Sequence, residues 1–405
     1  MRLILLVCIT ATITEYYLTR RIFNPTTILG WPFVVVIGIN KIFGNKLGFY
    51  EISSKTIFYI TTGIFAFFIG SIFSIIIKKC INRNKYKNIN KKNQILIDYK
   101  INKIYNYSMI IIIINFGRLF VFWNRYGLRN FIINDGMESI LLTGIFSHFL
   151  LTLYPLIPIL TSYGLRNKSY KYFLPLILIS ILMFFTFTKY HLISLALIVI
   201  IYLNIENPKL LSKTIPVIVL IPIGIFILNY LTNFRARGIV AEENYILNHL
   251  FNYISGGLIY DSINPGITYN NYGIVEIILT MIMVIPNLFT NALFGVKFYP
   301  FEVLPFSSMG WNGERGNVLN TISFLFSSGN ILGTLIVMVL LGVLIGFIHS
   351  QRKIQYPFMA TVYTFLFLSF YATFLVLAPP WEMIIFSVII PRIFVEKRVI
   401  IYEEK

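Results

Sequence analysis

Two arginines occupy alternate positions in the segment NFRARG, at Arg235 and Arg237. If this stretch is extended, both side chains face the same way, because side chains separated by two positions share one face of a strand. Arginine binds phosphate oxygens in a two-pronged manner, since its planar guanidinium matches their geometry. The pair is therefore predicted to clamp a pyrophosphate. The alternative interpretation is anchoring to anionic lipid headgroups.

A histidine follows a short distance along the chain. His249 and Tyr253 are four residues apart in NHLFNYISGG, so both face one side of a helix. Histidine is the side chain best suited to act as a general base near neutral pH. His249 is therefore a predicted catalytic base, with Glu242 as the alternative base. A structural hydrogen bond for the histidine and a solvated loop for the glutamate are the competing interpretations.

A polar cluster precedes the apolar run that begins near residue 331. Its members are Glu314, Arg315, Asn317, Asn320 and Thr321. Amide and hydroxyl groups suit the hydroxyls of a sugar, so the cluster is predicted to bind substrate together with Tyr253. A helix cap followed by an ordinary polar loop explains the same residues equally well.

Arg118 lies inside an otherwise apolar run. A charge within a membrane span is costly and usually faces the interior of a helix bundle, which predicts a role in substrate binding. The alternative is that the side chain extends to the nearby membrane surface.

The elements that position these residues must be membrane helices. Of the 405 residues, 57% are hydrophobic and 12% are charged, against about 25% charged in an average soluble protein. The mean hydropathy of +0.76 excludes a soluble enzyme, a disordered chain and a secreted disulfide scaffold. We expect an all-α polytopic membrane protein with about 11 transmembrane helices, within a range of 10 to 12. The expected spans are 3–18, 28–43, 56–77, 104–122, 139–163, 172–187, 191–204, 214–231, 331–349, 356–377 and 382–395.

The distribution of charge predicts the orientation. The loop 78–103 is rich in lysine and arginine and contains one acidic residue, Asp98, so the positive-inside rule makes it cytoplasmic. Alternation then places the other short basic loops on the same side. The chain is thus predicted to consist of spans one to eight (1–231), a large extracytoplasmic loop (232–330), and the last spans with a cytoplasmic tail (331–405). The net charge of +18 follows from this topology and gives no reason to expect nucleic acid as a partner.

The large loop contains one further apolar stretch, 273–294. A single crossing there would invert the spans that follow and place their basic ends outside. We therefore expect a re-entrant or interfacial helix, broken at Pro286.

Motifs for nucleotide or metal chemistry are missing from the sequence. There is no Walker A motif, no GxGxxG fingerprint and no HExxH or paired metal spacing. We expect no cofactor and no metal.

Several short motifs together resemble a known family. They are an early N-P-x5-W segment (Asn24, Pro25, Trp31), the Arg235–Arg237 start of the outer loop, the YISGG stretch from Tyr253 to Gly257, and a closing N-x-x-N-T motif (Asn317, Asn320, Thr321) with a later G-x-x-x-G (Gly329, Gly333). With the span layout, the sequence resembles the Wzy-type oligosaccharide repeat-unit polymerases, which build O-antigen, capsule or exopolysaccharide chains.

The resemblance implies glycosyl transfer at the outer face of the bacterial inner membrane, facing the periplasm or exterior. The donor is a growing glycan on undecaprenyl pyrophosphate, and the acceptor is a lipid-linked repeat unit. The acceptor hydroxyl attacks the anomeric carbon of the donor, and the lipid pyrophosphate leaves. Arg235 and Arg237, with Arg118 or Arg315, would stabilise its charge without a metal. Membrane lipids, a chain-length regulator and a flippase are the expected partners.

Two alternatives stay open. An O-antigen ligase uses the same donor with a different acceptor. A lipid-linked oligosaccharide flippase or another transporter would show paired halves and charges at the membrane midplane, and the sequence has no convincing internal repeat.

Overall fold

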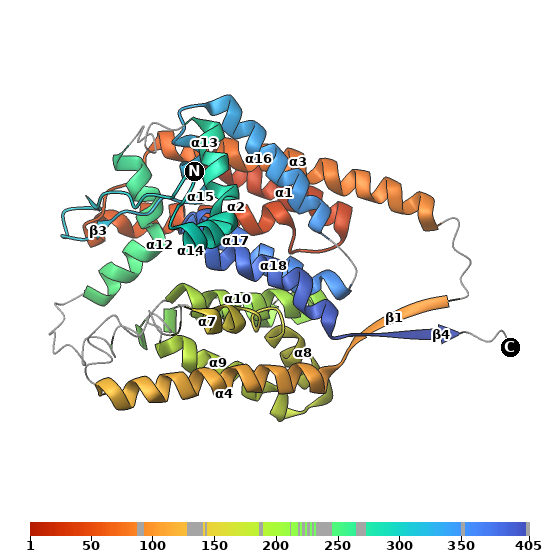
Figure 1. The fold of residues 1–405 in the computed structure, drawn as a ribbon. Coiled ribbons are helices and arrows are strands. Elements are labelled where there is room, and N and C mark those ends of the chain that lie inside the picture. The colour runs from red at the N-terminus through yellow and green to blue at the C-terminus, as the bar shows by residue number, and fades with distance from the viewer. Residues whose placement is uncertain are drawn as a thin grey trace. The chain divides into compact units, whose positions relative to one another are not determined.

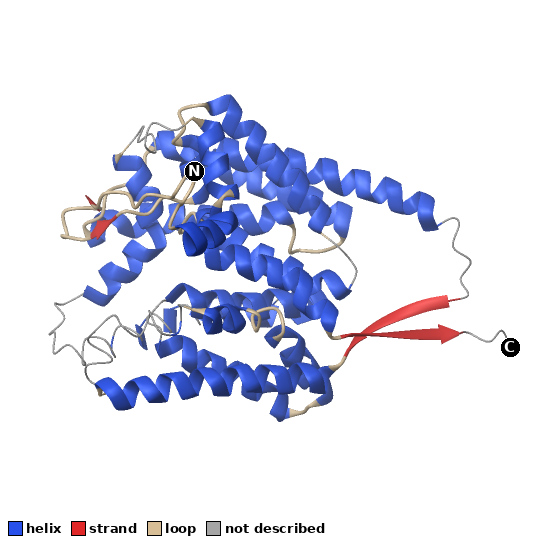
Figure 2. Ribbon diagram, in the orientation of Figure 1, coloured by secondary structure: helices blue, strands red, loops and turns tan. Residues whose placement is uncertain are grey.

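The computed structural model of the chain describes residues 1–86, 93–127, 141, 144–185, 189–210, 212–217, 219–220, 223–224, 227–228, 231, 245–264, 273–349 and 353–401. The described part is predominantly helical (Figures 1 and 2). It divides into two compact units. Unit 1 comprises Met1–Lys87, Leu247–His349 and Phe365–Trp381, and unit 2 comprises Asn88–Ile246, Ser350–Thr364 and Glu382–Lys405.

Five of the described helical segments are long and apolar enough to cross a membrane. They are Arg2–Thr19, Pro25–Leu47, Ser54–Ile81, Ile101–Tyr126 and Ile331–Ile348. Each coincides with one of the expected spans. The prediction of a helical membrane protein is therefore confirmed, whereas the full set of about eleven spans stays a prediction.

Unit 1 is built around two long helices. Its elements are α1 (Arg2–Thr19), α2 (Pro25–Ile39), η1 (Asn40–Gly44), η2 (Asn45–Leu47), α3 (Ser54–Tyr86), α12 (Tyr245–Ile263), α13 (Ile274–Ile282), α14 (Val284–Phe294), β2 (Ser307–Ser308), β3 (Arg315–Gly316), α15 (Thr321–Phe326), α16 (Ile331–Ile348), η7 (Leu368–Phe370) and η8 (Phe374–Val376). Helices α3 and α16 approach each other closely because small residues line their contact. A Cβ atom at Gly342 would lie 2.1 Å from the backbone oxygen of Phe67, and one at Gly70 would lie 2.0 Å from that of Val339.

A buried carboxylate joins the first three helices of unit 1. Glu15 of α1 has no exposed surface, and its carboxylate accepts hydrogen bonds from the Thr26 backbone N–H (3.2 Å), the Thr26 hydroxyl (2.7 Å) and the Ser71 hydroxyl (2.7 Å). Thr26 lies in the first turn of α2, where backbone N–H groups lack partners within the helix. Trp31 of the N-P-x5-W motif reinforces this junction, because its Nε1–H donates to the Thr12 hydroxyl at 2.9 Å. Glu15 thus serves as a cap supplied by a neighbouring helix.

Unit 2 contains most of the remaining helices. Its elements are β1 (Asn93–Tyr99), α4 (Ile101–Tyr126), α7 (Ile145–Leu151), α8 (Ile157–Asn167), η3 (Tyr170–Phe173), α9 (Leu174–Phe185), α10 (Lys189–Glu206), η4 (Pro208–Leu210), η6 (Lys353–Gln355), the greater parts of α17 (Tyr356–Phe367) and α18 (Ala378–Ile393), and β4 (Val395–Ile401). Two expected spans are interrupted. The run 139–163 contains α7 and α8 separated by turns, and the run 356–377 contains α17 followed by two short 3-10 helices. Prolines at 155 and 158 favour the first interruption, since proline cannot continue a helix in its interior.

The segment 78–103, expected as a basic loop between two spans, contains regular structure. Helix α3 continues to Tyr86, and β1 and β4 form an antiparallel pair in which Asn93 lies opposite Ile401 and Tyr99 opposite Val395. The sequences NQILIDY and VEKRVII are rich in β-branched residues, which favour strands. The basic composition of the loop concealed this local preference.

The apolar stretch of the large loop folds as a bent helix pair. Helices α13 and α14 differ in direction by 66°, an arrangement compatible with a broken span or a re-entrant loop. The break falls at Met283 instead of the expected Pro286, which lies within the first turn of α14. A proline ring clashes with the carbonyl of the residue four positions earlier, here Ile282, so the bend forms in the turn before the proline.

Candidate functional site

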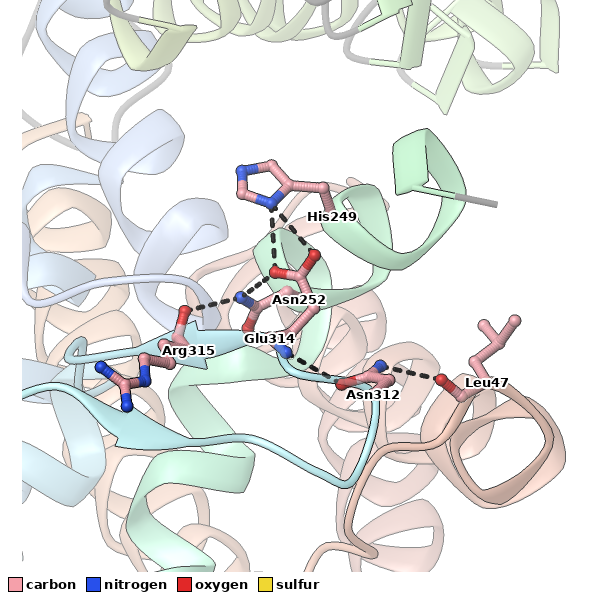
Figure 3. A network of polar contacts seen from close by, with 6 residues as sticks. All are labelled: Leu47, His249, Asn252, Asn312, Glu314 and Arg315. Carbon is pink, nitrogen blue, oxygen red and sulfur yellow. Dashed lines mark hydrogen bonds and ion pairs between the residues drawn. The ribbon is translucent and has the colours of Figure 1, made fainter. Parts of the chain in front are cut away.

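A histidine–glutamate pair forms the centre of the candidate site in unit 1 (Figure 3). His249 projects from α12, and its Nδ1 lies 3.1 Å from Oε2 of Glu314, which directly precedes β3. The His249 side chain is 22% exposed and that of Glu314 is 10% exposed. A carboxylate at Nδ1 fixes the tautomer in which this nitrogen carries the proton, and so leaves Nε2 as the basic nitrogen. The pair therefore has the arrangement of a base and its orienting carboxylate.

The loop that carries Glu314 is anchored at several points. β2 and β3 pair as a short antiparallel ladder, and the Glu314 backbone N–H donates to Oδ1 of Asn312 at 3.1 Å. The Asn312 amide in turn donates to the Leu47 carbonyl at 2.8 Å. Gly48 has a φ of 79°, and a Cβ there would lie 2.9 Å from the Cβ of Asn312, so glycine permits both the turn and the close approach. The end of the second span thus holds Glu314 in place.

Two further side chains of α12 complete the cluster. The Asn252 amide donates to Oε2 of Glu314 at 3.1 Å and to the Arg315 carbonyl at 2.9 Å. The ring of Tyr253 lies 5.2 Å from the imidazole of His249 and stacks on Tyr371 at 5.7 Å. The imidazole is thus bordered by a carboxylate and an aromatic ring.

The two motif segments that are distant in the sequence meet in unit 1. Gly257 ends the YISGG stretch, and a Cβ at this position would lie 2.8 Å from the Tyr371 backbone oxygen and 3.4 Å from the Asn320 backbone nitrogen. Only glycine allows this approach without displacement of the backbone. The YISGG stretch and the N-x-x-N-T motif therefore belong to one packed assembly.

The structure gives the closing motif mainly structural contacts. Asn320 is fully buried and caps α15, since its Oδ1 accepts the Ser323 backbone N–H at 2.9 Å. Thr321 is buried and donates to the Ala372 carbonyl at 3.2 Å, while the half-buried Asn317 donates to the Leu304 carbonyl at 3.2 Å. Of these residues, Asn317 is the one with a partly exposed side chain, and the helix-cap interpretation applies to Asn320.

Two of the predicted site arginines, Arg315 and Arg118, lie in the described part, one in each unit. Arg315 is exposed, and Figure 3 shows its guanidinium directed away from His249, as expected for consecutive residues of a strand. Arg118 belongs to unit 2, where it donates to Oδ1 of Asn115 at 3.0 Å and lies 5.0 Å from the centre of the Phe146 ring. Arg235, Arg237 and Glu242 lie outside the described residues, so the proposed clamp and the alternative base stay predictions.

Asp261 is a candidate that the motif search did not select. This carboxylate of α12 accepts the Ser323 hydroxyl at 2.9 Å, and Ser323 in turn accepts the Asn320 amide. Burial raises the pKa of the Asp261 carboxyl above its usual range, while hydrogen bonds from Ser323 and Thr56 and the charge of Lys55 oppose that shift. A buried carboxyl with a raised pKa at the junction of two motifs is a feature shared with acid–base groups.

The sequence held a signal for one of the missed residues. Asn252 is three positions after His249, and residues at this spacing are neighbours on a helix. Asp261 gave no comparable signal, because its burial depends on packing between distant segments.

A search against protein-family models, curated proteins and solved structures finds no match for this chain.

Proposed function

We propose that this protein polymerises undecaprenyl-pyrophosphate-linked oligosaccharide repeat units by glycosyl transfer at the outer face of the bacterial inner membrane. The observation that carries the proposal is the His249–Glu314 dyad, which lies in the predicted large loop of a chain with helices long and apolar enough to cross a membrane. A base held beside polar groups outside the spans suits a reaction between two lipid-bound glycans. The resemblance in motifs supplies the substrate class.

In the proposed reaction, Nε2 of His249 accepts the proton of the acceptor hydroxyl. The hydroxyl oxygen forms a bond to the anomeric carbon of the donor glycan, and the bond from that carbon to the pyrophosphate oxygen breaks. Glu314 stabilises the imidazolium that results, because an opposite charge nearby favours the protonated form. The polyprenyl pyrophosphate leaves with both electrons of the broken bond.

The leaving pyrophosphate requires positive charge. Arg235 and Arg237 are the proposed clamp, with the exposed Arg315 as a third cation from the loop that carries Glu314. Guanidinium groups aimed at the leaving oxygens lower the barrier by stabilising charge that develops in the transition state. Arg118 is proposed to contact the lipid-linked substrate from its own helix, and the bent α13–α14 pair is proposed to stay on the outer side of the membrane.

The test is the glycan ladder produced by single variants in a strain that lacks the native gene. His249→Ala is expected to lower the rate of chain extension by about 10²- to 10⁴-fold, the usual contribution of a general base, and to leave single repeat units. Arg235→Ala and Arg237→Ala are expected to give the same collapse. His148→Ala, which alters the histidine of a second His–Glu pair, is the matched control and is expected to leave the ladder intact.

The outcome separates the alternatives. Polymer that accumulates on the lipid carrier in the His249 variant identifies a ligase, because a ligase acts after polymerisation. A full ladder in His249→Ala at normal protein abundance overturns the role of the dyad, and a full ladder in both arginine variants overturns the clamp.

A further inference from the structure

Helix α14 and the loop that follows it form an apolar surface on unit 1. Three large side chains of α14 are strongly exposed, with exposed fractions of 65% for Phe289, 72% for Leu293 and 74% for Phe294. The loop adds Val303 at 77% and Phe306 at 66%, and residues 284–296 contain no charged side chain. Burying such a surface stabilises a protein by about 25 cal/mol for each Å² removed from water, so its exposure to water is unfavourable.

Two polar side chains of α14, Asn287 and Thr290, are engaged with the backbone of the following loop. The Asn287 side chain accepts the Phe298 N–H at 2.8 Å and donates to the Phe298 carbonyl at 2.7 Å. The Thr290 hydroxyl donates to the Val296 carbonyl at 2.8 Å. The loop is therefore folded back on α14, and these two side chains are already paired, which lowers the cost of placing them in an apolar environment.

The placement of α14 separates it from the spans. It has 11 residues, about half the length needed to cross a bilayer, and it follows a 66° bend. Within unit 1, α3 and α16 run along the plane of Figure 1, whereas α14 is seen nearly end-on. A short helix that lies across the spans and carries an apolar stripe has the geometry of a helix in the membrane interface.

Helix α13 links the apolar surface of α14 to a span. Ile274, at the start of α13, lies against α16, where its Cγ2 would be 3.1 Å from a Cβ at Gly333. The neighbouring Leu332 of α16 is 70% exposed, as expected for a residue that faces acyl chains. From this junction the chain runs through α13 into α14.

We infer that α14 is an interfacial membrane anchor: the stripe Pro286–Phe289–Leu293, with Phe294, inserts into the outer leaflet among the lipid acyl chains. The hydrocarbon of the bilayer is the occupant, because the α13–α14 pair is apolar enough to enter a membrane and α14 itself carries no charged side chain. The Asn287 side faces the protein's own loop. This anchoring is independent of the proposed glycosyl transfer and holds for a membrane protein of any activity.

The experiment measures the depth of labelled positions in liposomes of phosphatidylethanolamine and phosphatidylglycerol. The background is Cys80→Ser, which removes the exposed native cysteine and retains the buried Cys8. Leu293→Cys and Phe289→Cys carry an environment-sensitive fluorophore, and Glu302→Cys, at an exposed charged position in the following loop, is the control. Quenching by lipids with a spin label on the acyl chain is expected to be several-fold stronger at 293 and 289 than at 302, and quenching by aqueous iodide several-fold weaker.

Equal iodide quenching at 293 and 302 overturns the proposal. Burial of the label at 293 that occurs only when a polyprenyl pyrophosphate is added also overturns it, and assigns the surface to the substrate chain. A second variant makes the test independent of any one cysteine. Leu293→Lys is expected to increase iodide quenching of a label at position 289, because the charged side chain opposes insertion. Leu293→Met is the control and is expected to leave this quenching unchanged.

Discussion

Glu15 and Glu314 are both largely buried glutamates of unit 1, and they differ in what holds them. Glu15 receives hydrogen bonds from two hydroxyls and from a backbone N–H at the N-terminus of α2. Hydroxyl and backbone amide groups do not change their charge near neutral pH. Glu314 shares its carboxylate with a titratable imidazole and retains 10% exposure. Burial and hydrogen bonding are common to both, so these properties alone do not distinguish a cap from a catalytic group. The chemical identity of the hydrogen-bond partner distinguishes the cap from the catalytic group.

Replacing Glu15 is expected to have the largest effect. Glu15→Ala leaves the Thr26 N–H and the hydroxyls of Thr26 and Ser71 without their acceptor inside the bundle. Each unsatisfied buried group costs about 1–3 kcal/mol, so a loss of about 3 kcal/mol or more is expected. Thermal unfolding in detergent and the amount of protein in membranes measure it.

Glu15→Gln is the matched control, because its amide oxygen still accepts hydrogen bonds, and its loss should be smaller. Wild-type unfolding temperature in the alanine variant would show that Glu15 does not cap α2.

Replacing Glu314 is expected to affect catalysis more than folding. Glu314→Gln keeps the size of the side chain and removes the charge that supports the His249 imidazolium, so glycan extension should slow by about 10²-fold, the lower end for acid–base catalysis. Extension of a purified lipid-linked repeat unit measures the rate. Glu302→Gln, at an exposed glutamate of the same loop, should retain the wild-type rate. An unchanged rate in Glu314→Gln would place Glu314 with Glu15 among structural residues.

Asp261 sharpens the comparison because it has hydroxyl partners like those of Glu15 and lies on the helix of His249. Since burial raises the pKa of the Asp261 carboxyl, the folded protein binds its proton more tightly than the unfolded chain. This stabilisation is complete below the unfolded pKa and is lost as the pH rises through the folded pKa. The unfolding temperature of Asp261→Asn relative to wild type should therefore increase with pH between the pKa of Asp261 in the unfolded chain and its pKa in the folded protein, and then level off. A difference that is constant with pH would contradict the raised pKa.

The second His–Glu pair gives the smallest expected effect. His148 and Glu382 of unit 2 lie 2.5 Å apart, and the His148 side chain is 46% exposed, so solvent screens the interaction. Glu382→Gln should cost about 1 kcal/mol or less and leave the glycan ladder unchanged. Chemical denaturation and the ladder assay measure the two quantities. A loss of polymer equal to that of Glu314→Gln would mean that both pairs act in the reaction.

Periodicity and hydropathy predicted the parts of the fold that depend on local composition. The spans that correspond to α1, α3 and α16 were predicted from their apolar runs alone. The strand pair β1–β4 was not predicted, because its partners are about 300 residues apart, as Asn93 and Ile401 illustrate. The break at Met283 depends on a steric clash that acts one turn before the proline.

The candidate site was predictable to a similar degree. The helical spacing of His249 and Tyr253 indicated their common side, and the cap at Asn320 was one of the interpretations considered. The contact between His249 and Glu314 and the burial of Asp261 required the fold, since each depends on the packing of α12 against residues 312–323. Sequence patterns therefore indicated the residue types, and tertiary contacts selected the partners.

The glycine-mediated contact of α3 with α16 has a mechanical consequence. At Gly342 the backbones are too close for any other residue, so a shift of one helix along the other would bring bulkier side chains against a main chain. At the far end of the pair, the Lys78 ammonium donates to the Phe347 and His349 carbonyls at 2.6 Å and fixes the last turn of α16. At the opposite end, the first turn of α3 contributes Thr56 to the surroundings of Asp261. The α3–α16 pair is therefore rigid, and any movement within unit 1 is expected in the segments that pack against this pair and not between its two helices.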